Sequence, residues 1–214
     1  MVSVKFCGLT REGDAREAAA LGASYVGAIF AGGPRSLAPE RARDVLAGAG
    51  AGVDRVGVFG ADGPDVVRDV ARVVGLTVVQ LHGDPRAADV RGVRARFGGA
   101  VWAVARAEGS LLPEWAEELF READAVLLDA RVPGQLGGTG VTLEWDALAR
   151  SLDAVRGVTP VVLAGGLRPS NVAAAVRAIA PDIVDVSSGV EQSPGIKDHL
   201  KMRAFVEAVR GSGV

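Results

Sequence analysis

Eight short runs rich in valine and other apolar residues alternate along the chain with longer segments rich in alanine and charged residues. Each short run is bounded by glycine, proline or polar residues, which is typical of β-strands. We expect strands at residues 2–6, 25–30, 54–59, 77–81, 100–105, 125–129, 160–164 and 183–187. Because strands that alternate with helices pair in parallel, this pattern predicts an α/β fold.

The segments between the strands carry signals for helices and their ends. Segment 11–22 finishes on Gly22, and glycine is favoured just past the end of a helix. Segment 169–180 offers Ser170 as an N-cap. The final segment, 197–211, repeats apolar residues at the helical period. We therefore expect helices in these segments.

The number of units and the chain length favour a closed barrel. Eight strand–helix units follow one another in 214 residues, with no composition break and no long linker. This organisation predicts a single (β/α)8 TIM barrel domain over residues 1–214. The alternative is an open, doubly wound parallel sheet. No G-x-G-x-x-G motif follows the first strand, which weakens a dinucleotide-binding version of that alternative.

Composition excludes several classes of function. The formal net charge is -2, so the chain has no basic footprint for nucleic acid or for an anionic membrane surface. A single cysteine excludes an internal disulfide and a cysteine-built metal site. The sequence shows neither a signal peptide nor an apolar stretch long enough to span a bilayer. We expect a soluble cytoplasmic protein that acts on a small molecule.

Strand polarity places a thiol and a carboxyl at the mouth of the predicted barrel. Side chains alternate along a strand, so Lys5 and Cys7 share the inner face while Val4 and Phe6 face the helices. Asp129 ends the sixth strand. A thiol and a carboxyl on either side of one pocket suit a general base and a general acid. Taken alone, each has a plainer interpretation: a small buried apolar side chain and a turn residue.

The thiol must become a thiolate to act as a base, which requires its pKa to be lowered. Lys5, on the same face as Cys7, is the expected source of positive charge. A lysine inside a barrel also needs a partner of its own. We expect that partner to be Asp185, on the neighbouring eighth strand.

Three loops at the same rim are rich in glycine, and the later two also contain serine, a pattern that favours phosphate binding. Loops after strands seven and eight of such barrels often bind phosphate through backbone N–H groups and a helix N-terminus. A single Gly-Gly pair is more simply a tight turn, but here the pattern recurs after three consecutive strands. The candidate residues are Gly138 and Gly140 after the sixth strand, Gly165 and Gly166 after the seventh, and Ser187, Ser188 and Gly189 after the eighth.

Two further side chains are expected at the rim. Arg35 follows the second strand and is suited to bind a carboxylate in a bidentate manner, although a solvated surface arginine is the competing interpretation. His82 follows the fourth strand, where a structural imidazole is an equal alternative. His199 lies in the final segment and is expected to face solvent.

The motifs "KFCGLT", "PRS", "QLHG", "LLDA", "GGTG", "LAGGLRPSNV" and "VDVSSGVEQSPGIKD" occur in an order that resembles the N-(5′-phosphoribosyl)anthranilate isomerase family over nearly the whole chain. The resemblance implies a (β/α)8 barrel that needs no cofactor and no metal. It implies that Cys7 is the general base, that Asp129 is the general acid, that Arg35 binds the anthranilate carboxylate, and that the glycine and serine loops bind phosphate. Leu143 departs from the family, which commonly has an aromatic residue there.

The implied reaction converts N-(5-phospho-β-D-ribosyl)anthranilate to 1-(2-carboxyphenylamino)-1-deoxy-D-ribulose 5-phosphate, an Amadori rearrangement in tryptophan biosynthesis. Two alternatives remain open: a related isomerase of histidine synthesis, which typically uses two aspartates, and a non-catalytic barrel that binds a phosphorylated metabolite. The sequence does not determine the oligomeric state, which we expect to be a monomer or a homodimer.

Overall fold

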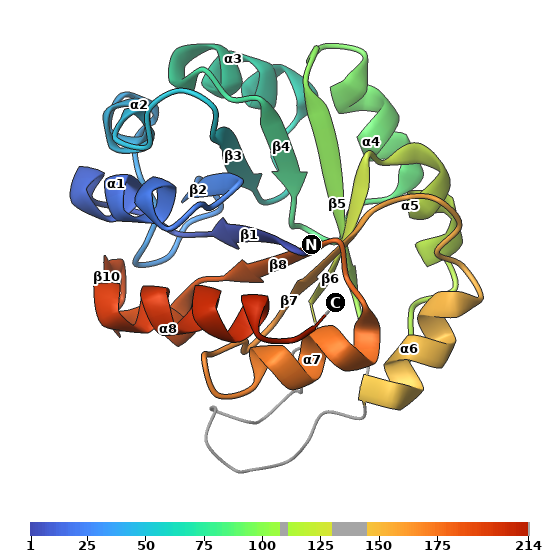
Figure 1. Cartoon of the computed structure of the whole chain (residues 1–214). Helices are drawn as coiled ribbons and strands as arrows, with labels where there is room; N and C mark the ends of the chain where they lie inside the picture. The colour runs from blue at the N-terminus through green and yellow to red at the C-terminus, as the bar shows by residue number, and fades with distance from the viewer. Residues whose placement is uncertain (108–110, 130–144, 214) are drawn as a thin grey trace.

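Eight parallel strands close into a barrel in the computed structural model of the protein, which describes residues 1–107, 111–129 and 145–213. Neighbouring strands pair in chain order, and the eighth pairs with the first to close the ring, as Figure 1 shows. The strands are β1 (Ser3–Phe6), β2 (Tyr25–Ile29), β3 (Asp54–Phe59), β4 (Val78–Leu81), β5 (Ala100–Arg106), β6 (Ala125–Asp129), β7 (Val161–Ala164) and β8 (Ile183–Val186). The predicted barrel is confirmed, and the open-sheet alternative is wrong.

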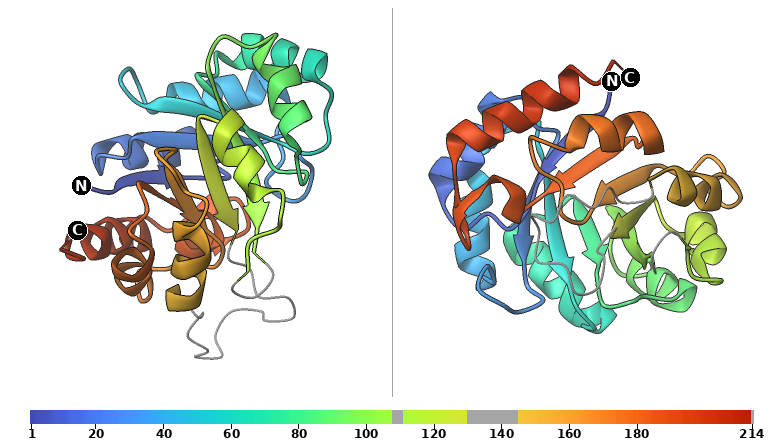
Figure 2. Two further views of the ribbon diagram at one scale, coloured as in Figure 1. Left: turned by 90° about the vertical axis from the view of Figure 1, so that its right-hand side faces the viewer. Right: turned by 90° about the horizontal axis from the view of Figure 1, so that it is seen from below.

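Eight helices surround the barrel in the described part of the chain, and the two ends of the chain lie side by side (Figure 2). The helices are α1 (Glu12–Ala20), α2 (Pro39–Ala47), α3 (Pro64–Val74), α4 (Ala87–Arg94), α5 (Ala116–Glu122), α6 (Trp145–Asp153), α7 (Val172–Ile179) and α8 (His199–Arg210). Gly22 follows the end of α1 with a positive φ of 83°, as its predicted place beyond a helix requires.

The expected N-cap of α7 is wrong. Asn171, not Ser170, stands at the cap position, and Ser170 is exposed. The Asn171 side chain closes the preceding turn instead: its oxygen accepts a hydrogen bond from the Arg168 backbone N–H (2.8 Å), and its nitrogen donates to the Gly166 carbonyl (3.2 Å). The helix starts later than expected because the residues before Asn171 form this turn.

The barrel strands are apolar on both faces, and each face has its own core. Outward side chains such as Phe6 pack against the helices, where the Phe6 and Phe205 rings lie 6.3 Å apart between centroids. Inward side chains such as Trp102 and Leu127 fill the barrel interior. With both faces buried, the strands read as near-continuous hydrophobic runs. The polar inward positions near the carboxyl ends of the strands are therefore the exceptions that mark the site.

A short hairpin between β8 and α8 was not expected from the sequence. A 3-10 turn (Ser188–Val190) leads into β9 (Glu191–Ser193), which pairs antiparallel with β10 (Ile196–Lys197). The Pro-Gly pair at its tip is a turn signal that identifies this hairpin in retrospect, and Gly195 has the positive φ (82°) that such a turn uses. The hairpin carries two charged residues into the site.

Two features are absent among the residues that the structure describes. None of these helices is both long and apolar enough to cross a bilayer. No group of three or more histidine, cysteine, aspartate or glutamate side chains among them is arranged to hold a metal ion.

Candidate active site

Cys7 and Asp129 both lie at the carboxyl ends of barrel strands. Cys7 directly follows β1, and its backbone N–H donates to the Val186 carbonyl at the end of β8 (2.9 Å). Asp129 is the last residue of β6, in register with Ala164 on β7. Both residues are buried, with 6% and 7% of their surface exposed. The structure thus places both candidate proton-transfer groups at the mouth of the barrel, where the sequence predicted them.

Lys5 pairs with Asp185 across the seam between β1 and β8. Its Nζ lies 2.7 Å from Asp185 Oδ2 and donates a second hydrogen bond to Gln80 Oε1 (2.8 Å). Burial lowers the pKa of Lys5, but the Asp185 carboxylate and the neighbouring Cys7 outweigh burial and raise that pKa above its ordinary value. The predicted pair is confirmed, and its ammonium stays charged beneath Cys7.

The expected lowering of the Cys7 pKa is wrong for the free protein. Burial raises the pKa of the thiol above its ordinary value, because a thiolate is poorly solvated there. The Lys5 and Lys197 charges act in the opposite direction, and the Asp185 charge adds to burial. The positive charge that the sequence led us to expect is present, but desolvation exceeds it.

Asp129 has an imidazole and a guanidinium as neighbours. His82 Nε2 lies 3.8 Å and Arg106 Nε 3.9 Å from Asp129 Oδ2. Burial lowers the pKa of His82, so the ring is neutral near pH 7. Its Nδ1 lies 3.2 Å from the Gln80 side-chain amide nitrogen, and accepting from that donor leaves the proton on Nε2, facing Asp129. His82 is therefore a polar neighbour of the candidate acid.

Arg106 was missed by the sequence interpretation. It ends β5, where its Nη2 donates to the His82 carbonyl (2.7 Å) and its Nη1 contacts Asp84. These contacts hold the loop after β4 against the end of β5. With 21 arginines in the chain, nothing in the sequence singles this one out.

The loops after β7 and β8 approach each other closely. Gly165 and Gly166 both have positive φ values (86° and 69°), so they form a turn that other residues rarely adopt. A Cβ on Gly189 would lie 1.8 Å from the Leu167 carbonyl oxygen, so only glycine permits this contact between the loops. Ser187 is half-buried beside them and Ser188 is exposed. Gly138 and Gly140 lie outside the described residues.

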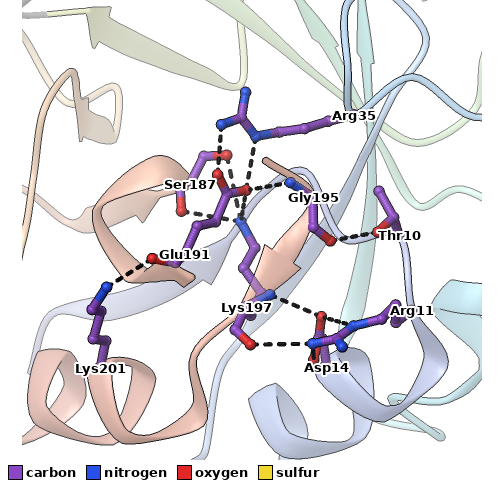
Figure 3. Close-up of polar contacts among 9 residues, drawn as sticks. All are labelled: Thr10, Arg11, Asp14, Arg35, Ser187, Glu191, Gly195, Lys197 and Lys201. Carbon is purple, nitrogen blue, oxygen red and sulfur yellow. Dashed lines mark hydrogen bonds and ion pairs between the residues drawn. The ribbon is translucent and has the colours of Figure 1, made fainter. Parts of the chain in front are cut away.

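Arg35 reaches the same rim, beside Cys7 and Ser187. Gly8 lies against both Arg35 and Ser187. It has a positive φ of 68°, and a Cβ there would lie 2.7 Å from Arg35 Cδ and 2.9 Å from Ser187 Oγ. The Arg35 side chain is 22% exposed and binds Glu191 through Nε (2.7 Å to Oε1) and Nη2 (2.5 Å to Oε2), as Figure 3 shows. Arg35 is therefore no freely solvated surface arginine.

Glu191 and Lys197, from the hairpin, are the other site residues that the sequence interpretation missed. Lys197 Nζ lies 2.9 Å from Glu191 Oε1 (Figure 3). Burial raises the pKa of Glu191, but hydrogen bonds from Arg35 and the charge of Lys197 hold it below its ordinary value. The closing motif "GVEQSPGIKD" contains both residues, and the available signal was that Lys197 is one of only three lysines in the chain.

His199 does not simply face solvent. Its Nε2 lies 2.9 Å from Asp14 Oδ1, although 45% of the side chain is exposed. Asp14 is buried at the start of α1, and an imidazole at the surface can complete its hydrogen bonds. The contact joins α1 to α8. Because Asp14 also accepts a hydrogen bond from the Lys197 backbone N–H, the contact helps to hold the hairpin in place.

The described side chains provide what an acid–base reaction on an anionic sugar requires. A thiol and a carboxyl end two strands of one barrel, a buried ammonium lies beneath the thiol, and a guanidinium and glycine–serine loops border the same rim. Proton transfer between positioned side chains and a bound ligand is the chemistry that such groups perform.

Comparison with known proteins identifies a consistent set of relatives. The family model described as "N-(5'phosphoribosyl)anthranilate (PRA) isomerase" matches residues 4–208. A Haloferax volcanii protein named N-(5'-phosphoribosyl)anthranilate isomerase is 44% identical over 214 residues, covering 98% of this chain and 94% of that protein. The Rubrobacter xylanophilus protein of the same name is 41% identical over 211 residues, covering 98% and 100%.

Solved structures agree with the sequence comparisons. The crystal structure of phosphoribosyl anthranilate isomerase from Thermotoga maritima is similar with a TM-score of 0.86 and 36% identity, covering 99% of this chain and 100% of that one. A second similar structure, with a TM-score of 0.82 and 34% identity, covering 99% and 100%, holds phosphoribosyl anthranilate isomerase in complex with reduced 1-(o-carboxyphenylamino)-1-deoxyribulose 5-phosphate.

Proposed function

The chain belongs to the N-(5'-phosphoribosyl)anthranilate isomerase family, and from that premise we propose how its own residues carry out the reaction. It is an isomerase of tryptophan biosynthesis that converts N-(5-phospho-β-D-ribosyl)anthranilate to 1-(2-carboxyphenylamino)-1-deoxy-D-ribulose 5-phosphate. The reaction moves protons and opens a ring without any net redox change. We propose that residues 1–214 act as one catalytic domain.

Asp129 is the general acid in this proposal. Its carboxyl transfers a proton to the furanose ring oxygen, the bond between that oxygen and C1 breaks, and the nitrogen lone pair forms an iminium with C1. Arg106 and the neutral His82, both within 4 Å of the carboxyl, supply donors that stabilise the carboxylate left behind. The ring opens as a result.

Cys7 is the general base. Its thiolate removes the proton from C2, which the neighbouring iminium makes acidic, and the electrons of that C–H bond form the enolamine. The enol then loses its hydroxyl proton while C1 gains one, which yields the ketose. The positive iminium adds to the Lys5 charge beside the thiol, so the ring-opened state favours the thiolate that burial disfavours in the free protein.

Two anionic groups of the substrate orient it between acid and base. The Arg35 guanidinium accommodates the anthranilate carboxylate on the edge that Glu191 leaves free. The backbone amides and hydroxyls around Gly166, Ser187 and Ser188 accommodate the phosphate. That Gly138 and Gly140 contribute to this site stays a prediction.

One observation carries the proposal: the single cysteine and the β6 aspartate both occupy carboxyl-end positions of a closed barrel, with Arg35 at the same rim. A related isomerase of histidine synthesis typically uses two aspartates, and here a thiol stands at the first strand. A non-catalytic phosphate-binding barrel has no need of either proton-transfer group.

Turnover of phosphoribosylanthranilate tests the assignment. We expect Cys7→Ser and Asp129→Asn each to reduce kcat at least about a hundredfold, the lower range for loss of an acid or base group, with substrate affinity largely kept. Asp65→Asn, which changes an exposed carboxyl on α3, is the matched control and should behave like the wild type. Full activity in either site variant would remove that residue from the mechanism.

We also infer the setting in which the enzyme works. A cytoplasmic location fits an enzyme of amino-acid biosynthesis with a small phosphorylated substrate. A Thermotoga maritima relative is described as dimeric, and for this chain a monomer or a homodimer is the expectation that size-exclusion chromatography tests.

A further inference from the structure

The Lys197 ammonium is fully buried next to the proposed substrate site, yet every one of its donors is engaged. Its Nζ contacts Glu191 Oε1 (2.9 Å), the Ser187 carbonyl (3.0 Å) and Ser187 Oγ (3.5 Å). None of its side-chain surface is exposed. The ammonium therefore connects the hairpin to the turn that follows β8 and is held in one position by both.

Glu191 links the Lys197 ammonium to Arg35. Its Oε1 accepts from Lys197 Nζ, from Arg35 Nε and from the Gly195 backbone N–H (3.2 Å), and its Oε2 accepts from Arg35 Nη2. A carboxylate bound by two parallel N–H bonds holds a guanidinium plane in one orientation. The plane of Arg35 is thus determined by a carboxylate that is itself held by Lys197.

The hairpin that carries both residues is anchored to the first helix. The Lys197 backbone N–H donates to Asp14 Oδ2 (3.1 Å), and Arg11 Nη2 donates to the Lys197 carbonyl (3.1 Å). Lys201 Nζ, on α8, donates to the Glu191 carbonyl (2.8 Å). Figure 3 shows these contacts converging on β9 and β10 from α1 and α8. The pair is therefore held from both sides by rigid elements.

We propose that Glu191 and Lys197 are positioning residues that hold the Arg35 guanidinium and the Ser187 turn at one separation, so that the enzyme selects a ligand carrying a carboxylate and a phosphate at the matching distance. This inference rests on the proposed roles of Arg35 and the loop after β8. In this proposal, Glu191 and Lys197 contact no substrate atom. They act through Arg35 and Ser187.

Physical reasoning favours a geometric role over a purely stabilising one. A buried ion pair is weak support for stability, because desolvation of both charges offsets their attraction. An apolar pair of similar volume would stabilise the hairpin equally well, but it would leave Arg35 without an orienting carboxylate and Ser187 without a donor to its carbonyl. Preorganised partners reduce the ordering cost that a ligand meets on binding.

Selectivity between two ligands tests the inference. The first probe is reduced 1-(o-carboxyphenylamino)-1-deoxyribulose 5-phosphate, and the second is the same compound without the ring carboxylate. Titration calorimetry gives both dissociation constants, and their ratio measures recognition of the carboxylate. We expect Glu191→Gln to reduce this ratio about tenfold, the loss of one charge-assisted hydrogen bond. Glu12→Gln, an exposed carboxylate paired with Arg16, should leave the ratio unchanged.

Arg35→Ala separates failure of the inference from failure of the proposed function. We expect Arg35→Ala to lower the ratio, and Glu191→Gln added to Arg35→Ala to lower it no further, because Glu191 acts through Arg35. A lowered ratio in Arg35→Ala with an unchanged ratio in Glu191→Gln overturns the inference and leaves the function standing. An unchanged ratio in Arg35→Ala overturns both, since no carboxylate contact then exists.

A neutral pair provides the same measurement without an unpaired buried charge. In Glu191→Gln with Lys197→Met, neither buried partner is charged, so this variant avoids the cost of the unpaired buried ammonium that Glu191→Gln alone carries. We expect its ratio to fall as in the single variant, together with weaker binding of the second probe, because Ser187 loses its donor. Wild-type values for both ligands would refute the positioning role.

Discussion

At the scale of single residues, the Cys7 thiol is subject to two opposing effects. Burial disfavours its thiolate, whereas the Lys5 ammonium, two residues earlier on β1, favours it. Burial exceeds the charge in the free protein. The proposed iminium would add a further positive charge at the moment the base is needed. The reactivity of the thiol therefore depends on what is bound beside it.

Titration of the only cysteine tests this balance. We expect the thiolate absorbance of the ligand-free enzyme to appear with a midpoint above 9.0, the ordinary pKa of the group. Because the folded-state pKa is the higher one, the stability that Cys7 contributes is complete below about pH 9 and is lost as pH rises through the folded-state value. Cys7→Ser supplies the blank. A midpoint clearly below 9.0 would contradict the dominance of burial.

At the scale of elements, the segment from β8 to α8 does the most to shape the site. It contains the Ser187 turn, the Glu191–Lys197 hairpin and the start of the last helix. Asp198 is the N-cap of that helix, and its side-chain oxygen accepts from the backbone N–H groups of Leu200 (3.0 Å) and Lys201 (3.2 Å). The cap directly follows Lys197, so the start of α8 and the end of the hairpin are determined together.

The α8 cap gives a prediction about stability. Asp198→Ala removes the acceptor for two N–H groups at the helix start and should lower the free energy of unfolding by about 1 kcal/mol. Urea denaturation followed by circular dichroism measures the change. Ser170→Ala is the matched control, because Ser170 is exposed and does not cap α7, and it should change stability by less than about 0.5 kcal/mol. Equal effects in the two variants would argue against the cap.

At the scale of the whole molecule, the barrel closes where β1 meets β8, and a buried charged pair of the barrel interior lies across that seam. Lys5 and Asp185 are register partners there. One oxygen of the pair, Asp185 Oδ1, is buried and has no hydrogen-bond partner among the described residues. The first and last strands are therefore joined by an ion pair that is not fully satisfied.

Removing one charge at the seam should cost far more than removing both. Asp185→Asn leaves the Lys5 ammonium buried without a counter-charge, and we expect it to lower the free energy of unfolding by about 3–5 kcal/mol. Lys5→Met combined with Asp185→Leu should recover most of that loss. Glu12→Gln, which breaks the exposed ion pair with Arg16, is the control and should change the free energy of unfolding by less than about 1 kcal/mol. Urea unfolding compares all three, and equal losses in the single and double seam variants would disprove the argument.

Several features were predictable from the sequence because they depend on residues close together in the chain. The alternation of strands and helices determines the parallel barrel, and the two-residue period of a strand places Lys5 and Cys7 on its inner face. The carboxyl-end positions of Cys7 and Asp129 follow from the same local rule. The motifs extended this interpretation to a family that the comparisons confirm.

Only the tertiary structure decided which distant side chains meet. Arg35 and Glu191 lie 156 positions apart in the chain, and no periodicity connects them. Arg106 reaches the candidate acid, and burial exceeds the Lys5 charge at Cys7, through packing of neighbouring strands. The physical reason is that a strand or helix follows from local backbone and hydrophobic preferences, whereas an ion pair and a pKa depend on every charge and apolar group that the closed barrel brings together.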